Sequence, residues 1–247
     1  MPSKNIGFSR TVFHSWMDAT ATLRVQTNDS LKIRQELEPI LAKHLTGTDA
    51  RRKTIDVLID IWHKSAYVSP TLHVQALELY RNAYVSTDHL WLHYGLALLY
   101  FSLFRQIVLS IGQISRIQET ITRNELKKRM AAEFGHLGAL DRSVERISAT
   151  LTDWDILPST NKRGYYQPIR SDLKTELPDI EIWLLACALF AHPAEALPFS
   201  DLLRLPELFP FRFTVKLEQL RHHSYFEVHR EGSGWYLVKL SDNFKEQ

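Results

Sequence analysis

Residues 121–169 read ITRNELKKRMAAEFGHLGALDRSVERISATLTDWDILPSTNKRGYYQPI, and this stretch decides the expected fold. Thr122 followed three residues later by Glu125 is a capping box, which predicts the start of a helix. The GHLG turn at 135–138 separates it from a second predicted helix, whose apolar residues recur at helical spacing. Two short extended pieces then flank a polar tip at 161–164. Helix, turn, helix and hairpin in this order predict a winged helix-turn-helix. The apolar positions of the second helix are Leu140, Val144, Ile147 and Leu151.

The opposite face of that second helix carries the predicted chemistry. Arginine side chains bind guanine edges or phosphate groups, and Ser and Thr hydroxyls bind phosphate oxygens. Because the apolar residues face inward, the polar ones are expected to point outward or to the flank. We expect DNA contacts from Arg142, Ser143, Arg146 and Thr150 on the helix, and from Lys162 and Arg163 at the hairpin tip.

A plain three-helix unit with a solvated charged face is the alternative for this stretch. Asp141 and Glu145 lie on the same helix and would repel phosphate. Tyr165 and Tyr166 after the tip could stack on a base, although strand tyrosines more commonly pack on a core.

The distribution of charge agrees with a nucleic-acid contact in this stretch. The 247-residue chain has a net charge of only +2 and 9 glycines. Residues 105–170 hold 11 Lys and Arg against 7 Asp and Glu, whereas residues 171–247 hold 8 against 12. Residues 105–170, which include the stretch at 121–169, are therefore basic, and the C-terminal third is acidic.

The one cysteine and the N-terminus indicate a cytoplasmic protein. Cys187 lies in an apolar run, and a single thiol cannot form an intrachain disulfide. The N-terminus lacks an apolar core of signal-peptide length. Residues 90–111 are the most membrane-like stretch, but His93 and Arg105 interrupt them. We therefore expect one long core helix from about residue 87 to 112 and no membrane contact.

The N-terminal residues 1–86 are expected to form a helical region. A helix beginning near Thr48 would place three cations in its first turn, where they oppose the helix dipole. A contact with a polyanion would compensate this arrangement, although a solvated helix start is the commoner explanation. The three cations are Arg51, Arg52 and Lys53.

The C-terminal residues 171–247 predict a second winged-helix-like unit. Helices are expected at 180–190, 199–205 and 211–222, followed by strands at 225–229 and 235–240 joined by a Gly-rich turn. Because this unit is acidic overall, contact with a protein is expected more than contact with DNA.

Motifs for catalysis and cofactor binding are absent from the sequence. It contains no G-x-x-x-x-G-K-[ST], G-x-G-x-x-G, G-x-S-x-G or H-E-x-x-H, and no C-x-x-C pair. His222 and His223 are adjacent and would point apart on a helix, so a zinc site with His229 is not expected. The chain is predicted to be no enzyme and to bind neither metal nor cofactor.

The chain resembles the BrxA-type accessory proteins of bacterial BREX phage-defence systems over roughly its first two-thirds. The resemblance is carried by LHYGLALLYFSLFRQIVL (92–109), the helix-turn-helix at 124–151, the closing WDIL (154–157) and the upstream DARRKTIDVLIDIW (49–62). It implies a non-enzymatic, helical, DNA-binding component that acts beside larger modification and ATPase subunits. It further implies phosphate contacts at Arg51, Arg52, Lys53, Lys127, Lys128, Arg142, Arg146, Lys162 and Arg163.

The predicted protein is thus mainly α-helical, with an N-terminal helical bundle (1–86), a long core helix plus a first winged-helix-like unit (87–170) and a second such unit (171–247). The expected function is non-catalytic binding of double-stranded DNA, with protein partners in a larger complex. An adaptor subunit that uses winged helices to bind protein is the alternative, and aromatic residues such as Trp183 and Trp235 suit that role.

Overall fold

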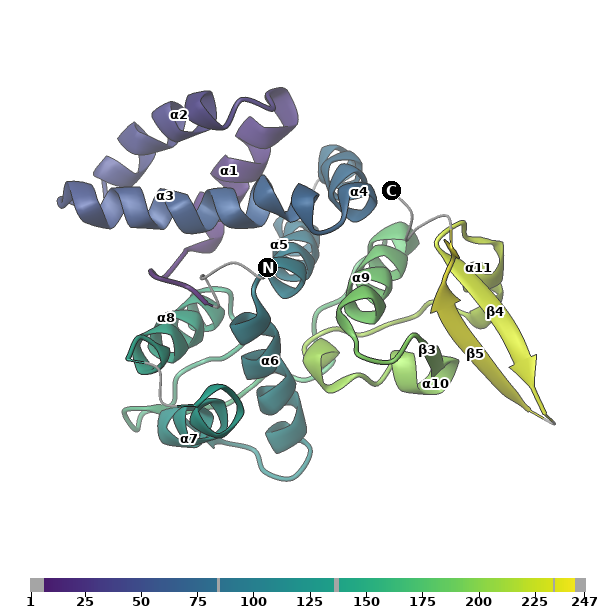
Figure 1. The fold of residues 1–247 in the computed structure, drawn as a ribbon. Helices are drawn as coiled ribbons and strands as arrows, with labels where there is room; N and C mark the ends of the chain where they lie inside the picture. The colour runs from purple at the N-terminus through teal and green to yellow at the C-terminus, as the bar shows by residue number, and fades with distance from the viewer. Residues whose placement is uncertain (1–6, 84, 136–137, 233, 243–247) are drawn as a thin grey trace.

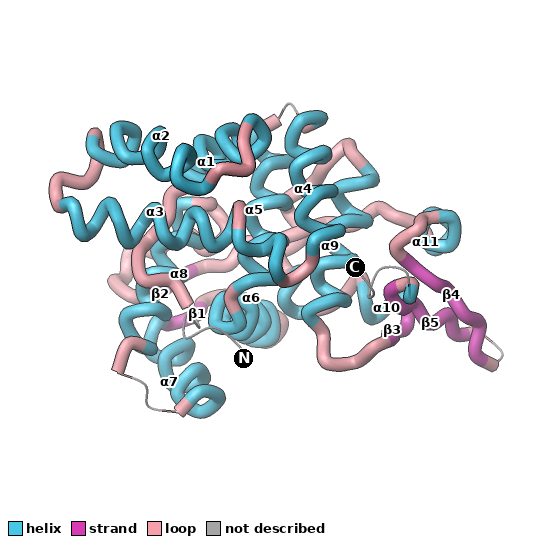
Figure 2. The backbone as a smooth tube through the Cα atoms, turned by 45° about the horizontal axis from the view of Figure 1, so that its top comes forward, coloured by secondary structure: helices cyan, strands magenta, loops and turns pink. Residues whose placement is uncertain are grey.

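The computed structural model describes residues 7–83, 85–135, 138–232 and 234–242. The fold is mainly helical, with two small antiparallel sheets, which confirms the predicted fold class at this level (Figures 1 and 2). The N-terminal helices and the C-terminal hairpin lie at opposite ends of the molecule. Buried residues from Phe8 to Leu240 form one continuous hydrophobic core, so the three predicted parts share their interior.

Four α-helices and a 3-10 turn make up the N-terminal part. They are α1 (His14–Gln26), α2 (Ser30–Ala42), α3 (Thr48–Trp62), η1 (Lys64–Tyr67) and α4 (Pro70–Asn82). Local sequence sets two of the starts. The Asp29 carboxylate accepts hydrogen bonds from the first turn of α2, and Ser69 caps α4 with Pro70 at its first position.

The prediction of one long core helix at residues 87–112 is wrong, because the chain forms two helices there. α5 (Ser86–Tyr100) and α6 (Ser102–Ser115) meet at 116°. Phe101 between them is extended, with φ −107° and ψ 105°. Its buried ring packs edge-on against Phe8, at 4.9 Å between centroids, and Phe8 also stacks on Phe104. Tertiary packing of these rings therefore outweighs the helical preference of the local sequence.

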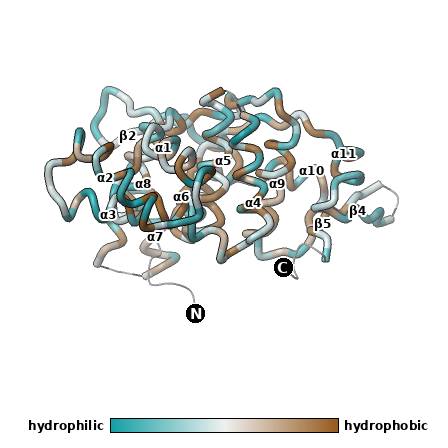
Figure 3. The backbone as a smooth tube through the Cα atoms, turned by 90° about the horizontal axis from the view of Figure 1, so that it is seen from above, coloured by the Kyte–Doolittle hydropathy of each residue, from teal (hydrophilic) through white to brown (hydrophobic). Residues whose placement is uncertain are grey.

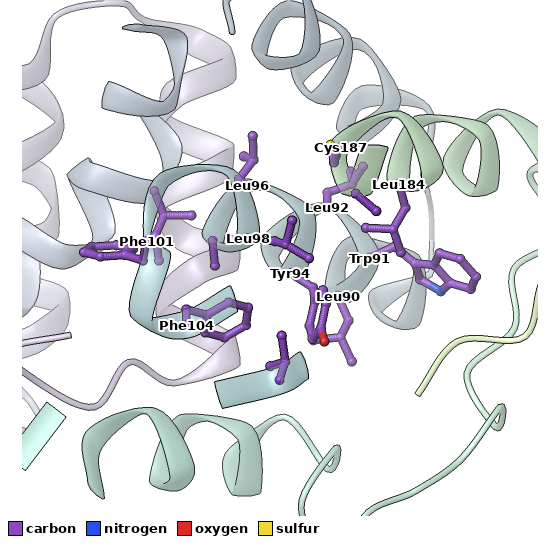
Figure 4. Packing of buried hydrophobic residues seen from close by; sticks show 14 of the residues in the cluster. Leu90, Trp91, Leu92, Tyr94, Leu96, Leu98, Phe101, Phe104, Leu184 and Cys187 are labelled. Carbon is purple, nitrogen blue, oxygen red and sulfur yellow. The ribbon is translucent and has the colours of Figure 1, made fainter. Parts of the chain in front are cut away.

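α5 is the central element of the core (Figure 4). It packs against α9 (Pro178–Ala191), where the ring of Trp183 lies so close to Gly95 that a Cβ there would overlap it. Figure 3 shows hydrophobic stretches concentrated where α5, α6 and α9 lie. In the part of the chain that the structure describes, no single helix is long and apolar enough to cross a membrane; only the bent α5–α6 pair passes that test.

After α6, residues 121–169 fold as two helices and a short hairpin at residues 159–166, which is closed by the bridge between Ser159 and Tyr166. In chain order its elements are β1 (Ile121–Thr122), α7 (Arg123–Phe134), α8 (Leu140–Asp153) and β2 (Tyr165–Tyr166). The capping box is confirmed, because Thr122 and Glu125 each accept a hydrogen bond from the other's backbone N–H. β1 pairs antiparallel with β2, and an isolated bridge joins Ser159 to Tyr166. Residues 136 and 137 of the predicted glycine turn lie outside the described residues.

The C-terminal part repeats this order with a larger sheet. After α9 come β3 (Ala196–Pro198), α10 (Phe199–Leu202), η2 (Pro206–Leu208), α11 (Leu217–His222), β4 (Phe226–Glu231) and β5 (Trp235–Leu240). The strand order is β3-β5-β4, with β5 antiparallel to both neighbours. The predicted hairpin at 225–240 is confirmed.

The predicted helix at 211–222 is only half formed, because α11 begins at Leu217. The buried carboxylate of Glu181 accepts hydrogen bonds from the backbone N–H groups of Thr214 and Val215, at 2.7 and 2.8 Å, and from the Thr214 hydroxyl at 2.9 Å. These bonds hold the segment before α11 in a non-helical conformation.

Candidate nucleic-acid interface

α8 separates its apolar and basic residues onto different faces. Its four predicted apolar residues are buried, as expected, and pack in the core beside α6 and α7. Arg142 and Arg146, one helical turn apart, are exposed. Within the residues that the structure describes, neither guanidinium forms a salt bridge. Two cations therefore project from this helix toward solvent.

Asp141 and Glu145 of α8 are neutralised from the neighbouring helix. Lys127 Nζ on α7 lies 2.8 Å from Glu145 Oε1 and 3.5 Å from Asp141 Oδ2. The hydrogen bond from Lys127 lowers the pKa of Glu145, and the nearby Arg123 and Arg146 add to this effect. The hydrogen bond to Glu145 in turn raises the pKa of Lys127. The sequence-based objection that Asp141 and Glu145 would repel phosphate is thereby weakened.

The flank of α8 is covered by the N-terminal segment, which corrects one expectation. Thr150 does not point outward: it is fully buried, and its hydroxyl accepts a hydrogen bond from the backbone N–H of Val12 at 3.0 Å. The backbone N–H of His14 donates to Asp153 at 2.7 Å. A Cβ at Gly7 would crowd Ser143, so this half-buried serine also faces the segment.

The hairpin beside α8 has a basic, exposed tip. Lys162 Nζ sits 4.0 Å from the centroid of the Tyr165 ring, within the range of a cation–π contact. Arg163 is exposed, and Gly164 supplies the left-handed turn with φ 79°. Tyr166 is buried, and its hydroxyl accepts hydrogen bonds from the Arg123 guanidinium, so its role is structural.

The three cations at the start of α3 are engaged within the protein. Arg51 pairs with Glu38 and donates to the carbonyls of Leu45 and Thr46, both at 2.9 Å, which closes the turn between α2 and α3. Arg52 and Lys53 each lie 2.8 Å from Asp49. This acidic residue in the first turn offsets the unfavourable dipole that the sequence implied.

Besides the buried Thr150, the ten other predicted site residues divide by their surroundings. In the described part of the chain, exposed residues without a salt bridge are Lys128, Arg142, Arg146 and Arg163, together with Lys162 on its tyrosine. Those in salt bridges are Arg51, Arg52, Lys53 and Lys127, and Ser143 is half-buried. The basic surface of α8 and its hairpin is brought together by the α7–α8 and β1–β2 contacts, with the α3 cations on a separate helix.

A half-buried polar cluster between α1 and α5 was missed by the sequence analysis. Asp18 Oδ1 accepts hydrogen bonds from His89 Nδ1 at 2.9 Å and His93 Nε2 at 3.0 Å. His14 Nδ1 lies 4.0 Å from the other Asp18 oxygen. The i,i+4 pairs His14–Asp18 and His89–His93 were the signal that could have revealed it.

The hydrogen bonds of this cluster argue against a metal site. Ligand atoms of His14, Asp18 and His93 lie within 4.8 Å of one another. However, the indole N–H of Trp62 donates to His93 Nδ1 at 3.1 Å, so a neutral His93 carries its proton on Nε2, the atom that faces Asp18. A metal would need the Nε2 lone pair, with a proton on Nδ1 instead. The donor set therefore fits a hydrogen-bonded ion pair better than a metal.

Comparison with protein-family models, curated proteins and solved structures finds no match to this chain. The resemblance to BrxA-type proteins accordingly stays a prediction, and function is inferred from the chain's own geometry.

Proposed function

We propose that this protein binds duplex DNA without catalysing a reaction on it. The observation that carries the proposal is the pair of exposed arginines on α8, Arg142 and Arg146, beside a hairpin with a basic tip. The order α6–β1–α7–α8–hairpin supports a winged-helix arrangement in which α8 enters the major groove. The hairpin tip would lie on the adjacent backbone.

Phosphate contacts would supply most of the affinity. The exposed cations available on α7, α8 and the hairpin are Lys128, Arg142, Arg146, Lys162 and Arg163. If each neutralises one phosphate, log Kd changes with log salt concentration with a slope of about 4 to 5. Ser143 would add a hydroxyl at the edge of this surface.

Fluorescence anisotropy tests the proposal with a random duplex of about 30 bp, long enough for several such footprints. The wild-type protein should bind with micromolar or tighter Kd at low salt and lose affinity as salt rises. The double variant R142E/R146E should bind at least about tenfold more weakly. The variant K32E/K43E, which changes the same charge on exposed residues of the α2 region, serves as the matched control. Equal affinity for both variants would contradict the proposal.

The resemblance to BrxA-type proteins extends the proposal to a cellular role. On this basis the chain acts in the cytoplasm as a DNA-binding component of a phage-defence complex and contacts larger protein partners. Co-purification with such subunits, with and without nuclease treatment, would test whether the association needs DNA.

A protein-binding adaptor is the second candidate. Of the two tryptophans expected to suit this role, Trp183 does not, because it is fully buried in the core, whereas Trp235 at the β4–β5 hairpin is 63 % exposed. Tyr67 after α3 is 79 % exposed, and exposed large aromatic side chains are typical of contact surfaces. An absence of any anisotropy change with DNA at low salt, together with a stable protein partner, would favour this role.

A further inference from the structure

A groove of about 560 Å³ lies where the end of α6 meets the C-terminal part of the chain. One wall is the last turn of α6, and the others are the linker at 170–171 and the segment from 201 to 211. Figure 1 shows that this segment runs beside α6. The volume is in the range of small-molecule sites. Neither the predicted DNA surface on α8 nor the half-buried Asp18 cluster includes these residues.

The walls of the groove are fixed by close packing. A Cβ at Gly112 would overlap the carbonyl of Pro206, so α6 and η2 approach as closely as a glycine allows. The Arg116 guanidinium donates to the backbone carbonyl of Arg204 across the same junction. On the linker side, the Arg212 guanidinium donates to the carbonyl of Ser171 at 2.9 Å. The groove is therefore a built feature between packed elements.

The charge of the lining is strongly unbalanced. Three arginines, Arg116, Arg170 and Arg204, line the groove, against the single acidic residue Asp201. The Asp201 carboxylate accepts a hydrogen bond from the Ser200 hydroxyl at 3.2 Å. Among the residues that the structure describes, none of the three arginines forms a salt bridge. Such a site favours an anion, and arginine matches the geometry of phosphate oxygens.

The floor of the groove is apolar. Leu203, Leu205, Leu208, Phe209 and Phe211 line it. An apolar floor below cationic groups suits a ligand that joins a planar or apolar body to an anionic group. A free inorganic anion would use only the arginines.

We propose that this groove binds a phosphate ester, with the phosphate on Arg170 and Arg204 and the organic part against the apolar floor. The ester could belong to a small nucleotide or to a phosphodiester of DNA. If the ligand is a small nucleotide, the inference is independent of DNA binding at α8. If it is a DNA phosphodiester, the inference rests on the proposed function.

The test compares wild-type protein with R170Q/R204Q, which leaves Arg116 and its structural hydrogen bond intact. R230Q, an exposed arginine on β4 outside the groove, is the matched control for one guanidinium. Isothermal titration calorimetry with adenosine monophosphate and with inorganic phosphate, at constant ionic strength, measures whether the groove binds a small phosphate ester. Fluorescence anisotropy with duplex DNA measures whether the groove contributes to DNA binding. Thermal unfolding verifies that the variants are folded.

We expect the wild type to bind adenosine monophosphate more tightly than inorganic phosphate. R170Q/R204Q should bind adenosine monophosphate about tenfold more weakly than the wild type does, and R230Q should bind it with the wild-type affinity. If only DNA binding weakens in R170Q/R204Q, the site holds and its phosphate comes from DNA. If no nucleotide binds and DNA affinity is unchanged, or if R230Q weakens binding as much as R170Q/R204Q, the inference is overturned. Because R142E/R146E tests α8 separately, failure of the groove and failure of the α8 surface are distinguishable.

Discussion

The ring of His89 on α5 joins Asp18 of α1 through a hydrogen bond of 2.9 Å from Nδ1 to Oδ1. Its other nitrogen, Nε2, lies 3.1 Å from the carbonyl oxygen of Ala83. A carboxylate and a carbonyl can only accept, so both ring nitrogens donate and the ring is a cation. Burial alone would lower the pKa of His89, but the hydrogen bond to Asp18 raises it overall. α1 and α5 are therefore joined by a half-buried, charge-assisted pair.

Replacing Asp18 with Asn should destabilise the fold. The change removes the negative charge that faces His89, and hydrogen bonds to charged groups contribute about 1.5–3 kcal/mol. We expect the free energy of unfolding to fall by about 2 kcal/mol, measured by urea denaturation followed by circular dichroism. D172N removes an exposed carboxylate and should be within about 0.5 kcal/mol of wild type. Equal stability of D18N and D172N would show that the pair contributes nothing.

Stability should also fall in mild acid because two buried histidines are neutral in the folded state. Burial lowers the pKa of His73 and of His93 to about 4, from an ordinary value of 6.5. Between these values the unfolded chain binds more protons, so the stabilising contribution is complete above pH 6.5 and is lost as the pH falls toward 4. His89 contributes to folding stability with the opposite dependence on pH. Because its pKa is raised in the folded state, its stabilising contribution is complete below pH 6.5 and is lost as the pH rises through the raised pKa.

Urea denaturation between pH 4.5 and 7.5 measures this dependence. The free energy of unfolding should rise with pH over the acidic part of that range, and His73→Asn should make the rise shallower. His73 suits this test because it is buried and its Nδ1 bonds a neutral partner, the Ser65 hydroxyl, at 2.9 Å. An unchanged slope in the variant would remove His73 from the explanation.

The sequence predicted the elements that local chemistry determines. The Thr122–Glu125 capping box and the buried face of α8 depend on spacing within one helix, and both are present in the structure. The hairpin at 225–240 was also predictable, because alternating strands around a glycine-rich turn are a local signal. These predictions needed no knowledge of distant contacts.

The features that sequence reasoning missed depend on distant partners. The break at Phe101 arises from packing on Phe8, and the non-helical segment before α11 arises from Glu181, which lies more than thirty residues earlier. Thr150 was expected on the surface because its partner, the backbone of Val12, is far away in the chain. The exposed arginines of α8 were therefore predictable from the spacing within that helix, whereas the packing of the N-terminal segment around Val12 against its flank was not.

Gly112 tests how tightly α6 and η2 are joined. A Cβ at this position would overlap the backbone of Pro206, which cannot move as a flexible side chain would. We expect Gly112→Ala to lower the free energy of unfolding by about 3 kcal/mol, at the upper end of overpacking effects. Gly138→Ala is the matched control, since a Cβ at Gly138 meets nothing within 4 Å. Equal chemical denaturation curves for the two variants would contradict the close packing.

Lys127 is expected to support DNA binding without touching DNA. It pairs with Asp141 and Glu145 on α8, so its removal leaves two carboxylates unpaired beside Arg142 and Arg146. We predict that K127M weakens DNA binding about three- to tenfold at low salt by anisotropy, because those carboxylates then repel phosphate and compete for the arginines.

The triple variant K127M/D141N/E145Q separates this effect from a direct contact. It lacks the lysine but also lacks both acidic charges, so affinity should return to the wild-type value or exceed it. If Lys127 itself bound phosphate, the triple variant would keep a reduced salt slope and would not fully recover. If K127M bound DNA as tightly as the wild type, the neutralising role of Lys127 would be refuted, although the R142E/R146E test of α8 would still stand.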